Sequence, residues 1–202
     1  MGLELIKTSN RLKGVVLCWL LLLIYLIFFF QGTFESMDNG VYQLIHSFES
    51  EHVTQIMKFI TFFGSTVFIV GVCFVCFIVN RKIGLWVSLN MASIALINQV
   101  IKWIVARPRP SVVHLVVETS YSFPSAHAMC SFVFYALFAF IIYQKGKKFG
   151  MILMVMPLLI GITRIYLGVH YTSDVLAGYL FALTYFVTIL FILFHHKKSP
   201  CS

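Results

Sequence analysis

The sequence has few charged residues for its length. Only 11% of its 202 residues are Asp, Glu, Lys or Arg, whereas 60% are hydrophobic and the mean hydropathy is +0.93. Soluble globular domains contain about 25% charged residues and about 45–50% apolar ones. This shortage of charge excludes a soluble globular domain and predicts an all-α, polytopic membrane protein.

Cysteine is scarce as well, and its placement does not suit a disulfide framework. The five cysteines are Cys18, Cys73, Cys76, Cys130 and Cys201. All but the last lie in apolar stretches, where thiols behave as small hydrophobic groups. Cys73 and Cys76 have a metal-like spacing, but no second Cys/His pair accompanies them, so no zinc or redox site is expected. Internal repeats and linkers are also lacking, which predicts a single domain over residues 1–202.

The chain is rich in long apolar stretches. A helix that crosses the hydrocarbon core needs about 20 mostly apolar residues. The stretches that qualify are residues 14–30, 58–79, 83–105, 127–143, 149–167 and 174–194. We therefore expect a six-transmembrane-helix bundle. The first stretch is expected to stay as an anchor, because its apolar core is long and no small-residue cleavage site follows it.

The segment between the first two stretches has a different pattern. Residues 31–57 carry Val41, Leu44, Ile45 and Phe48 at helical spacing, after a turn predicted at residues 38–40. Such a pattern indicates a short interfacial amphipathic helix on the outer side of the membrane.

The net charge of +8 is distributed unevenly along the chain. With both termini inside, the cytoplasmic pieces hold Lys7, Arg11, Lys13, Arg81, Lys82, Lys145, Lys147, Lys148, Lys197 and Lys198. The outer pieces hold the acidic residues Glu35, Asp38, Glu49, Glu51, Glu118 and Asp174. Bilayers keep Lys and Arg on the cytoplasmic side. We therefore expect a multi-pass cell-membrane protein with cytoplasmic termini, and we interpret the basic excess as a topology signal and not as a nucleic-acid surface.

Five basic residues on the outer half are not explained by this rule: Lys58, Lys102, Arg107, Arg109 and Arg164. Three of them are predicted at or next to outer helix ends. Two prolines after residue 106 should end the third helix, which places Lys102 one turn inside it and Arg109 in the exit loop. Arg164 lies one turn before Gly168, which should end the fifth helix. Ionisable residues at membrane depth usually mark function. Together these cations predict an anion site.

The segment YSFPSAHAMC opens the fourth helix with polar residues. Pro124 suits a first-turn position, and either Ser122 or Ser125 is able to cap the helix. The free N–H groups of a first turn and the helix dipole favour phosphate. His127 lies in that same turn.

A second histidine is paired with an acid. His170 and Asp174 are four residues apart, so they share a face if the sixth helix begins near His170. A carboxylate fixes the tautomer of an imidazole and makes its free nitrogen a better nucleophile. The two histidines thus offer a nucleophile and a proton donor.

These three blocks resemble the signature of the type 2 phosphatidic acid phosphatase superfamily, which reads K-x6-RP, PSGH and SR-x5-H-x3-D. Here the blocks are Lys102-x6-Arg109-Pro110, Pro124-Ser125-Ala126-His127 and Thr163-Arg164-x5-His170-x3-Asp174. Ala126 replaces the usual Gly, and Thr163 replaces Ser. Neither departure removes a side chain that performs chemistry.

The resemblance implies a metal-free phosphoryl transfer through a phosphohistidine, with no cofactor. His170 would attack phosphorus, Asp174 would orient it, and His127 would protonate the leaving alkoxide and then activate water. The phosphate would be held by Lys102, Arg109, Ser125, Arg164 and the backbone N–H groups near Ala126. The topology predicted from the charge distribution places this site at the outer face of the membrane.

The expected substrate is a lipid phosphate, because no soluble domain is present to capture a small metabolite. The compact size and short loops favour bacterial phosphatidylglycerol phosphate. Undecaprenyl diphosphate is the main alternative, and phosphatidic and lysophosphatidic acid are possible secondary substrates. The membrane is the only other partner expected, with no nucleic acid and no obligate protein partner.

Several polar residues remain for other roles. We expect Arg107 to meet lipid headgroups. His114 and Glu118 lie in the loop between the first two blocks; contact with a substrate headgroup is the less favoured interpretation of them, and their role stays open. A transporter is less favoured, because the polar groups cluster at one face of the bilayer instead of crossing it. A haem site using His127 and His170 is less favoured too, because axial ligands usually lie deeper.

Overall fold

The computed structural model describes the backbone of residues 2–196 and the side chains of residues 9–195. The side chains of Lys7, Lys197, Lys198 and Cys201, used in the sequence analysis, lie outside this range. The described residues contain helices and loops and no strand. The all-α prediction is confirmed.

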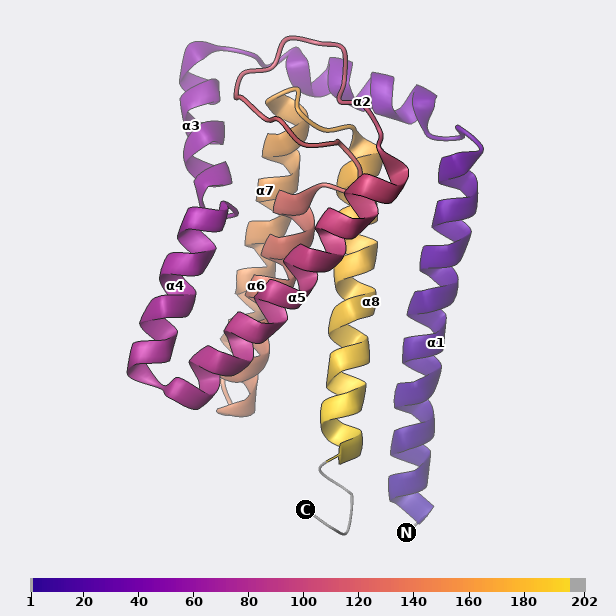
Figure 1. Cartoon of the computed structure of the whole chain (residues 1–202), viewed down its shortest axis with the longest axis vertical. Coiled ribbons are helices and arrows are strands. Elements are labelled where there is room, and N and C mark those ends of the chain that lie inside the picture. The colour runs from indigo at the N-terminus through magenta and orange to yellow at the C-terminus, as the bar shows by residue number, and fades with distance from the viewer. Residues whose placement is uncertain (1, 197–202) are drawn as a thin grey trace.

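Six helical spans in the described part are long and apolar enough to cross a membrane. They are Ser9–Phe30, Glu51–Val79, Arg81–Val105, Ala126–Gln144, Lys148–Tyr166 and Thr172–His195. Each overlaps one of the six apolar stretches found in the sequence. The first lies within α1 (Gly2–Phe30), which runs along the edge of the bundle (Figure 1).

Helix α2 (Glu35–His46) lies across one end of the bundle, and the start of α1 and the last residues of α8 lie at the opposite end (Figure 1). Its apolar side, with Val41 and Ile45, packs against Ala128, Ile165 and Val175. The predicted turn at residues 38–40 is wrong, because the helix runs straight through them. Asp38 is buried in polar contacts with other elements, and these contacts override its turn propensity.

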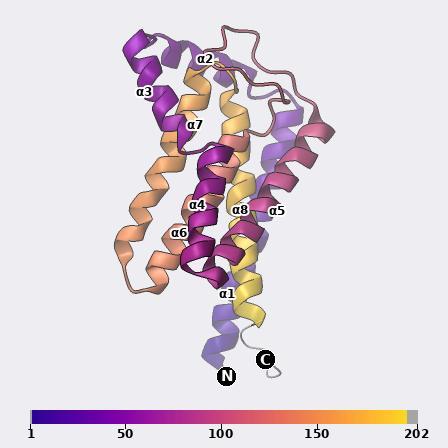
Figure 2. The ribbon, with the colours of Figure 1, turned by 60° about the vertical axis from the view of Figure 1, so that its left-hand side comes forward.

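The second span is made of two helices. Helix α3 (Glu51–Phe62) and α4 (Thr66–Val79) are separated by a short break around Gly64, where the chain bends (Figure 2). The hydroxyl of Ser65 caps α4 by accepting a hydrogen bond from the Phe68 N–H at 3.2 Å. Tyr135 donates to the carbonyl of Phe63 at 3.2 Å, which satisfies a backbone group at the break.

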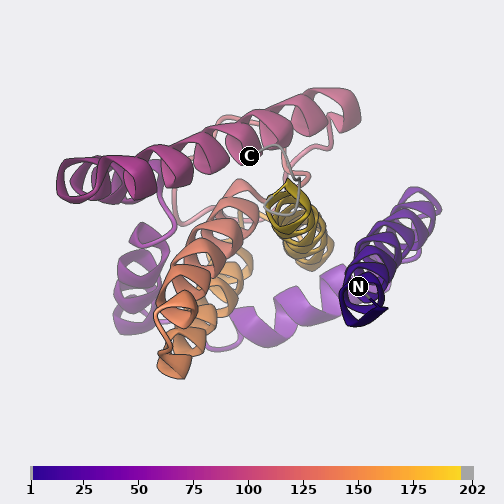
Figure 3. The same ribbon diagram turned by 90° about the horizontal axis from the view of Figure 1, so that it is seen from below.

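The remaining helices build the core. They are α5 (Arg81–Val105), α6 (Ala126–Gln144), α7 (Val155–Tyr166), preceded by the 3₁₀ segment η1 (Lys148–Met154), and α8 (Thr172–His196). From below, α5 runs along one side and α8 stands between it and α1 (Figure 3). Half of the apolar window of α6 is buried, against 11% of the α1 window, so α6 is the central helix.

Small residues allow close backbone approach at the α2 end of the bundle. A Cβ added to Gly178 in α8 would lie 3.0 Å from the carbonyl of Ser125 and 3.2 Å from the Met129 nitrogen. Without a hydrophobic driving force in lipid, helices associate through such close packing. The start of α8 is thus held directly against the start of α6.

The long loop of residues 106–125 covers this end of the bundle (Figure 1). Helix α5 stops at Val105, with Ala106 in the left-handed region, close to the end predicted from the two prolines. The loop packs on the turn after α7, where the Leu115 N–H donates to the Leu167 carbonyl at 3.1 Å. Gly168 in that turn has a φ of +73°, which favours glycine.

Candidate active site

Three distant segments meet at the end of the bundle that carries α2. Arg109, in the loop after α5, donates to the carbonyl of Val169 at 2.7 Å, and its Nη1 lies 3.4 Å from Nε2 of His170. The N–H of Ser125, before α6, donates to the carbonyl of Asp174 at 3.0 Å. The three sequence blocks therefore form one site.

His170 and Asp174 form a buried pair, although His170 lies just before α8 and not inside it. Nδ1 of His170 is 3.5 Å from Oδ2 of Asp174. That oxygen also accepts from the Ser122 hydroxyl at 2.5 Å and from the Tyr171 N–H at 3.0 Å. A guanidinium only donates, so the contact with Arg109 makes Nε2 the acceptor and leaves the proton on Nδ1, facing Asp174.

Burial controls the charge of this imidazole. Desolvation lowers the pKa of His170 to about 4, and the hydrogen bond and charge of Asp174 oppose that shift without cancelling it. His170 is therefore neutral at neutral pH, and the lone pair on Nε2 faces Arg109.

Two buried cations line the same site. Lys102 is 2% exposed and donates to the backbone carbonyls of Tyr121 and Ser122. Arg164 is equally buried; its Nη1 donates to Thr61 of α3 at 3.1 Å. The second span thus contributes to the site, a role that the sequence did not suggest.

Glu118 bridges the two arginines of the site. Its carboxylate accepts from Nη2 of Arg164 and lies 3.6 Å from Nη2 of Arg109. The sequence left the role of Glu118 open, and the structure shows it beside the two arginines. Arg109 and Arg164 are therefore placed so that one anionic group is able to contact both.

Three buried side-chain polar atoms have no hydrogen-bond partner among the described residues. One is the hydroxyl of Thr172; the other two belong to residues predicted to hold phosphate, and they are the hydroxyl of Ser125 and Nε of Arg164. Ser125 occupies the N-cap position of α6, yet its side chain makes no cap bond, and Ser122 is engaged with Asp174. The predicted side-chain cap is therefore wrong. A buried, unsatisfied polar group costs about 1–3 kcal/mol, so a role for these two atoms is expected.

His127 lies in the first turn of α6, and its imidazole is partly exposed. The charges that act on it come from Arg164, His170, Arg109 and Lys102. Those neighbours place His127 in the same cluster as the pair formed by His170 and Asp174.

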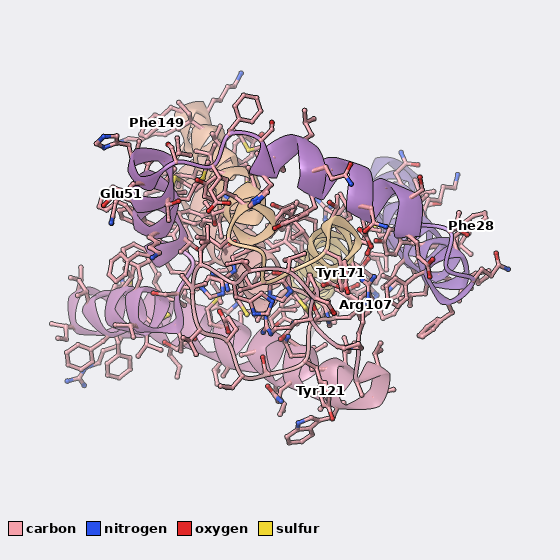
Figure 4. The ribbon with its side chains drawn as sticks, turned by 90° about the horizontal axis from the view of Figure 1, so that it is seen from above. Phe28, Glu51, Arg107, Tyr121, Phe149 and Tyr171 are labelled. Atoms are coloured by element: carbon pink, nitrogen blue, oxygen red, sulfur yellow. The ribbon has the colours of Figure 1, made fainter. Side chains whose placement is uncertain are left out.

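Arg107 does not meet lipid headgroups as the sequence suggested. Its Nη1 donates to Asp174 at 2.6 Å, its Nη2 donates to Asp38 at 3.0 Å, and its guanidinium lies 3.9 Å from the Tyr171 ring centroid (Figure 4). Burial lowers the pKa of Arg107, but the two carboxylates outweigh it and the net shift is upward. The sequence hid this role because Asp38 lies in a different segment, interpreted there as a turn.

Comparison with known proteins agrees with this arrangement. The family model described as the PAP2 superfamily matches residues 83–200. Phosphatidylglycerophosphatase B of Bacillus subtilis (strain 168) is 30% identical over 167 residues, which cover 77% of this chain and 82% of that protein.

Solved structures give the same result. The crystal structure of a transmembrane PAP2 type phosphatidylglycerolphosphate phosphatase from Bacillus subtilis matches with a TM-score of 0.81 and 28% identity, covering 93% of this chain and 98% of the other. Aquifex aeolicus LpxE shares the fold, with a TM-score of 0.60 and 21% identity over 76% of this chain and 93% of that one. The family model, the sequence relative and the fold agree, and the chain belongs to the PAP2 superfamily.

Proposed function

We propose that this membrane phosphatase hydrolyses the phosphomonoester of phosphatidylglycerol phosphate, giving phosphatidylglycerol and phosphate. The substrate is suggested by the names of its relatives, phosphatidylglycerophosphatase B and a phosphatidylglycerolphosphate phosphatase. The observation that carries the reaction type is the pair of unpartnered buried donors, the Ser125 hydroxyl and Nε of Arg164, beside a neutral imidazole. A phosphoryl group supplies acceptors for both donors.

The first step is a transfer of the phosphoryl group to His170. Its Nε2 lone pair forms the N–P bond while the P–O bond to the glycerol oxygen breaks, and His127 gives its proton to that oxygen. Asp174 stabilises the positive charge that appears on the His170 ring. In the second step His127 removes a proton from water, the water oxygen attacks phosphorus, and the N–P bond breaks to release phosphate.

The cations act on the phosphate oxygens. Arg109 and Arg164 already share one carboxylate, Glu118, so a phosphate with its larger charge is expected to displace it and contact both. Lys102, which donates to the Tyr121 carbonyl of the loop, adds a positive charge. The first-turn N–H groups of α6 near Ala126 are available as donors. Fixed donors of this kind stabilise charge that develops in the transition state.

The donor set supports a reaction without a metal ion. The acidic side chains at the site, Asp174 and Glu118, are both engaged by arginines. Residues 9–195 contain no group of three or more His, Cys, Asp or Glu side chains placed to hold a metal. Divalent cations prefer several oxygen ligands, and here arginines provide the positive charge instead.

The test is phosphate release from purified protein, with phosphatidylglycerol phosphate, phosphatidic acid and undecaprenyl diphosphate compared in EDTA. We expect turnover of phosphatidylglycerol phosphate to be fastest and to survive the chelator. A preference for undecaprenyl diphosphate would replace the proposed substrate, and loss of activity in EDTA would contradict the metal-free mechanism.

Two variants test the covalent step. His170→Ala is expected to abolish turnover and the trapping of labelled phosphate on the protein. His52→Ala, an exposed histidine of α3, is the matched control and should retain both. Labelled phosphate that remains on the His170→Ala protein would assign the nucleophile to another residue.

A further inference from the structure

Helix α2 contributes a carboxylate that reaches the pair formed by His170 and Asp174. Oδ1 of Asp38 accepts from the Ser173 N–H at 2.7 Å, and Oδ2 accepts from the Ser173 hydroxyl at 2.6 Å and from Nη2 of Arg107 at 3.0 Å. Asp38 is 2% exposed, although it belongs to a helix whose other polar residues are largely open. Each side-chain hydrogen bond of Asp38 goes either to Ser173, the neighbour of Asp174, or to the arginine that binds Asp174.

Arg107 connects the two acids. Its Nη2 donates to Oδ2 of Asp38. Its Nη1 donates to Oδ1 of Asp174 at 2.6 Å and to the Ser173 hydroxyl at 2.8 Å. A guanidinium is planar, so fixing one nitrogen fixes the direction of the other. Tyr171 covers one face of that plane, and Phe29 of α1 lies 5.0 Å away. Asp38 therefore fixes the position from which Arg107 donates to Asp174.

The two oxygens of Asp174 have separate tasks. Oδ1 is taken by Arg107, which leaves Oδ2 for Ser122, the Tyr171 N–H and Nδ1 of His170. If Arg107 shifted, the carboxylate would be free to rotate and Oδ2 would lose its alignment with the imidazole. An error of about 1 Å at such a point is able to cost about a hundredfold in rate.

The charge of Asp38 also affects His170. Asp38, Arg107 and Asp174 together carry one net negative charge, which complements the positive ring that forms when His170 is phosphorylated. Without the charge of Asp38, the arginine would neutralise Asp174, and the ring would face a pair with no net charge. Buried charges interact strongly, so this difference acts directly on the step in which the ring becomes positive.

We infer that Asp38 is a positioning residue for this phosphatase, holding Arg107 so that Asp174 is oriented and left with its charge for His170. The inference rests on the proposed phosphohistidine reaction. It also gives α2 a role beyond packing on the bundle end: this helix completes the active site. Val41 and Ile45 dock α2 by apolar contacts of their own, so docking does not depend on the Asp38 charge.

The test variant is Asp38→Asn, which keeps an oxygen for the Ser173 N–H and replaces the charged oxygen that accepts from Arg107 and from the Ser173 hydroxyl with an amide NH₂ donor. We expect kcat to fall about tenfold to a hundredfold while KM stays within about twofold, because the phosphate donors are untouched. Glu35→Gln, an exposed acid one turn earlier on α2, removes the same charge and should behave as wild type. Equal kcat in the two variants would overturn the inference.

A double-mutant cycle separates positioning from general destabilisation. In an Asp174→Asn background, Asp38→Asn is expected to cause no further loss of kcat, since its effect passes through Asp174. The same fold loss in both backgrounds would show an independent structural effect and overturn the inference. If Asp38→Asn does not fold, Ser173→Ala cuts the same bridge more mildly; it should lower kcat about threefold, and an unchanged kcat would contradict us.

A measurement without substrate keeps this inference separate from the proposed function. The ¹⁵N chemical shifts of His170, assigned by their loss in His170→Ala, report its tautomer. Wild type and Glu35→Gln should show the proton on Nδ1, and Asp38→Asn should show mixed tautomers. A single Nδ1–H tautomer in Asp38→Asn would overturn the role of Asp38, even if wild type failed to hydrolyse any lipid phosphate and the proposed function fell.

Discussion

At the scale of the residue, Asp174 has the most demanding position. It is fully enclosed, and it accepts hydrogen bonds from Arg107, Ser122 and a backbone N–H while facing His170. We predict that Asp174→Asn lowers kcat at least about a hundredfold, since the amide neither fixes the tautomer nor stabilises the positive ring. Phosphate release in single-turnover experiments measures this loss of rate. The KM for the same lipid should change little, and a variant that lost only affinity would contradict this role.

The pKa of His170 predicts the acid side of the pH profile. Because burial lowers this pKa from 6.5 to about 4, the imidazole stays neutral and nucleophilic until the pH approaches 4. We expect kcat/KM to fall below about pH 4 instead of near 6.5, because the protonated imidazole of His170 is no nucleophile. A rate that stays unchanged from neutral pH to below pH 4 would remove the assignment of His170.

The same shift links pH to stability. A folded-state pKa below the unfolded value means that the unfolded chain binds the proton more tightly. The stability associated with neutral His170 is therefore complete above about pH 6.5 and is lost as the pH falls toward 4. Thermal unfolding measured across this range distinguishes the loss of fold from the loss of the nucleophile.

Ser125 offers a test of the anion site. Its hydroxyl is buried and unpartnered, so Ser125→Ala should leave the Tm unchanged or raise it, while turnover falls about tenfold because a phosphate donor is gone. Ser131→Ala is the matched control, since Ser131 is buried on the same helix and bonds only to the Ala128 carbonyl at 3.3 Å. A marked loss of Tm in Ser125→Ala would assign that hydroxyl to the fold instead.

At the scale of the element, short turns hold the site together. Gly168 follows α7 with a φ of +73°, and a Cβ there would lie 2.5 Å from the Val113 carbonyl of the loop. We predict that Gly168→Ala destabilises the fold by about 1–3 kcal/mol and lowers kcat, because His170 lies two residues on. Gly71→Ala, in an open part of α4, should do neither. Thermal unfolding and phosphate release check both variants.

The elements also show what the sequence was able to predict. Apolar length identified the six spans, and the prolines after residue 106 located the end of α5, because both signals are local. The break at Gly64 and the continuous helix through Asp38 were missed. They depend on partners far along the chain, such as Tyr135 for the break and Ser173 for Asp38, and no periodicity records such contacts.

The site residues show the same difference between local signals and contacts over long sequence distances. The spacing of Lys102, Arg109, Arg164 and His170 marked the residues that meet at the bundle end, because each interrupts an apolar context. Arg107 was misplaced, since a cation after a membrane helix ordinarily meets headgroups. Its two carboxylate partners lie 69 residues earlier and 67 residues later, so only the folded chain reveals the pairing.

At the scale of the whole molecule, charge divides the two ends of the bundle. The end where α1 begins and α8 finishes carries Arg11, Lys13, Arg81, Lys82, Lys145, Lys147 and Lys148 (Figure 1). The end that holds the site carries the acids Glu35, Asp38, Glu49, Glu51, Glu118 and Asp174, and its cations Lys102, Arg107, Arg109 and Arg164 belong to the site itself. Loops rich in Lys and Arg stay on the cytoplasmic side, whereas acids have little influence. We therefore predict cytoplasmic termini and a site at the outer face of the cell membrane.

Single cysteines in a cysteine-free background test this orientation. Val117→Cys lies in the loop above the site, where Val117 is 91% exposed, and Lys147→Cys lies in the exposed turn after α6. A membrane-impermeant maleimide should label Val117→Cys in intact cells and Lys147→Cys only after permeabilisation. The reverse pattern would place the site on the cytoplasmic side, and a lipid phosphate of the inner leaflet would then be the substrate that reaches His170.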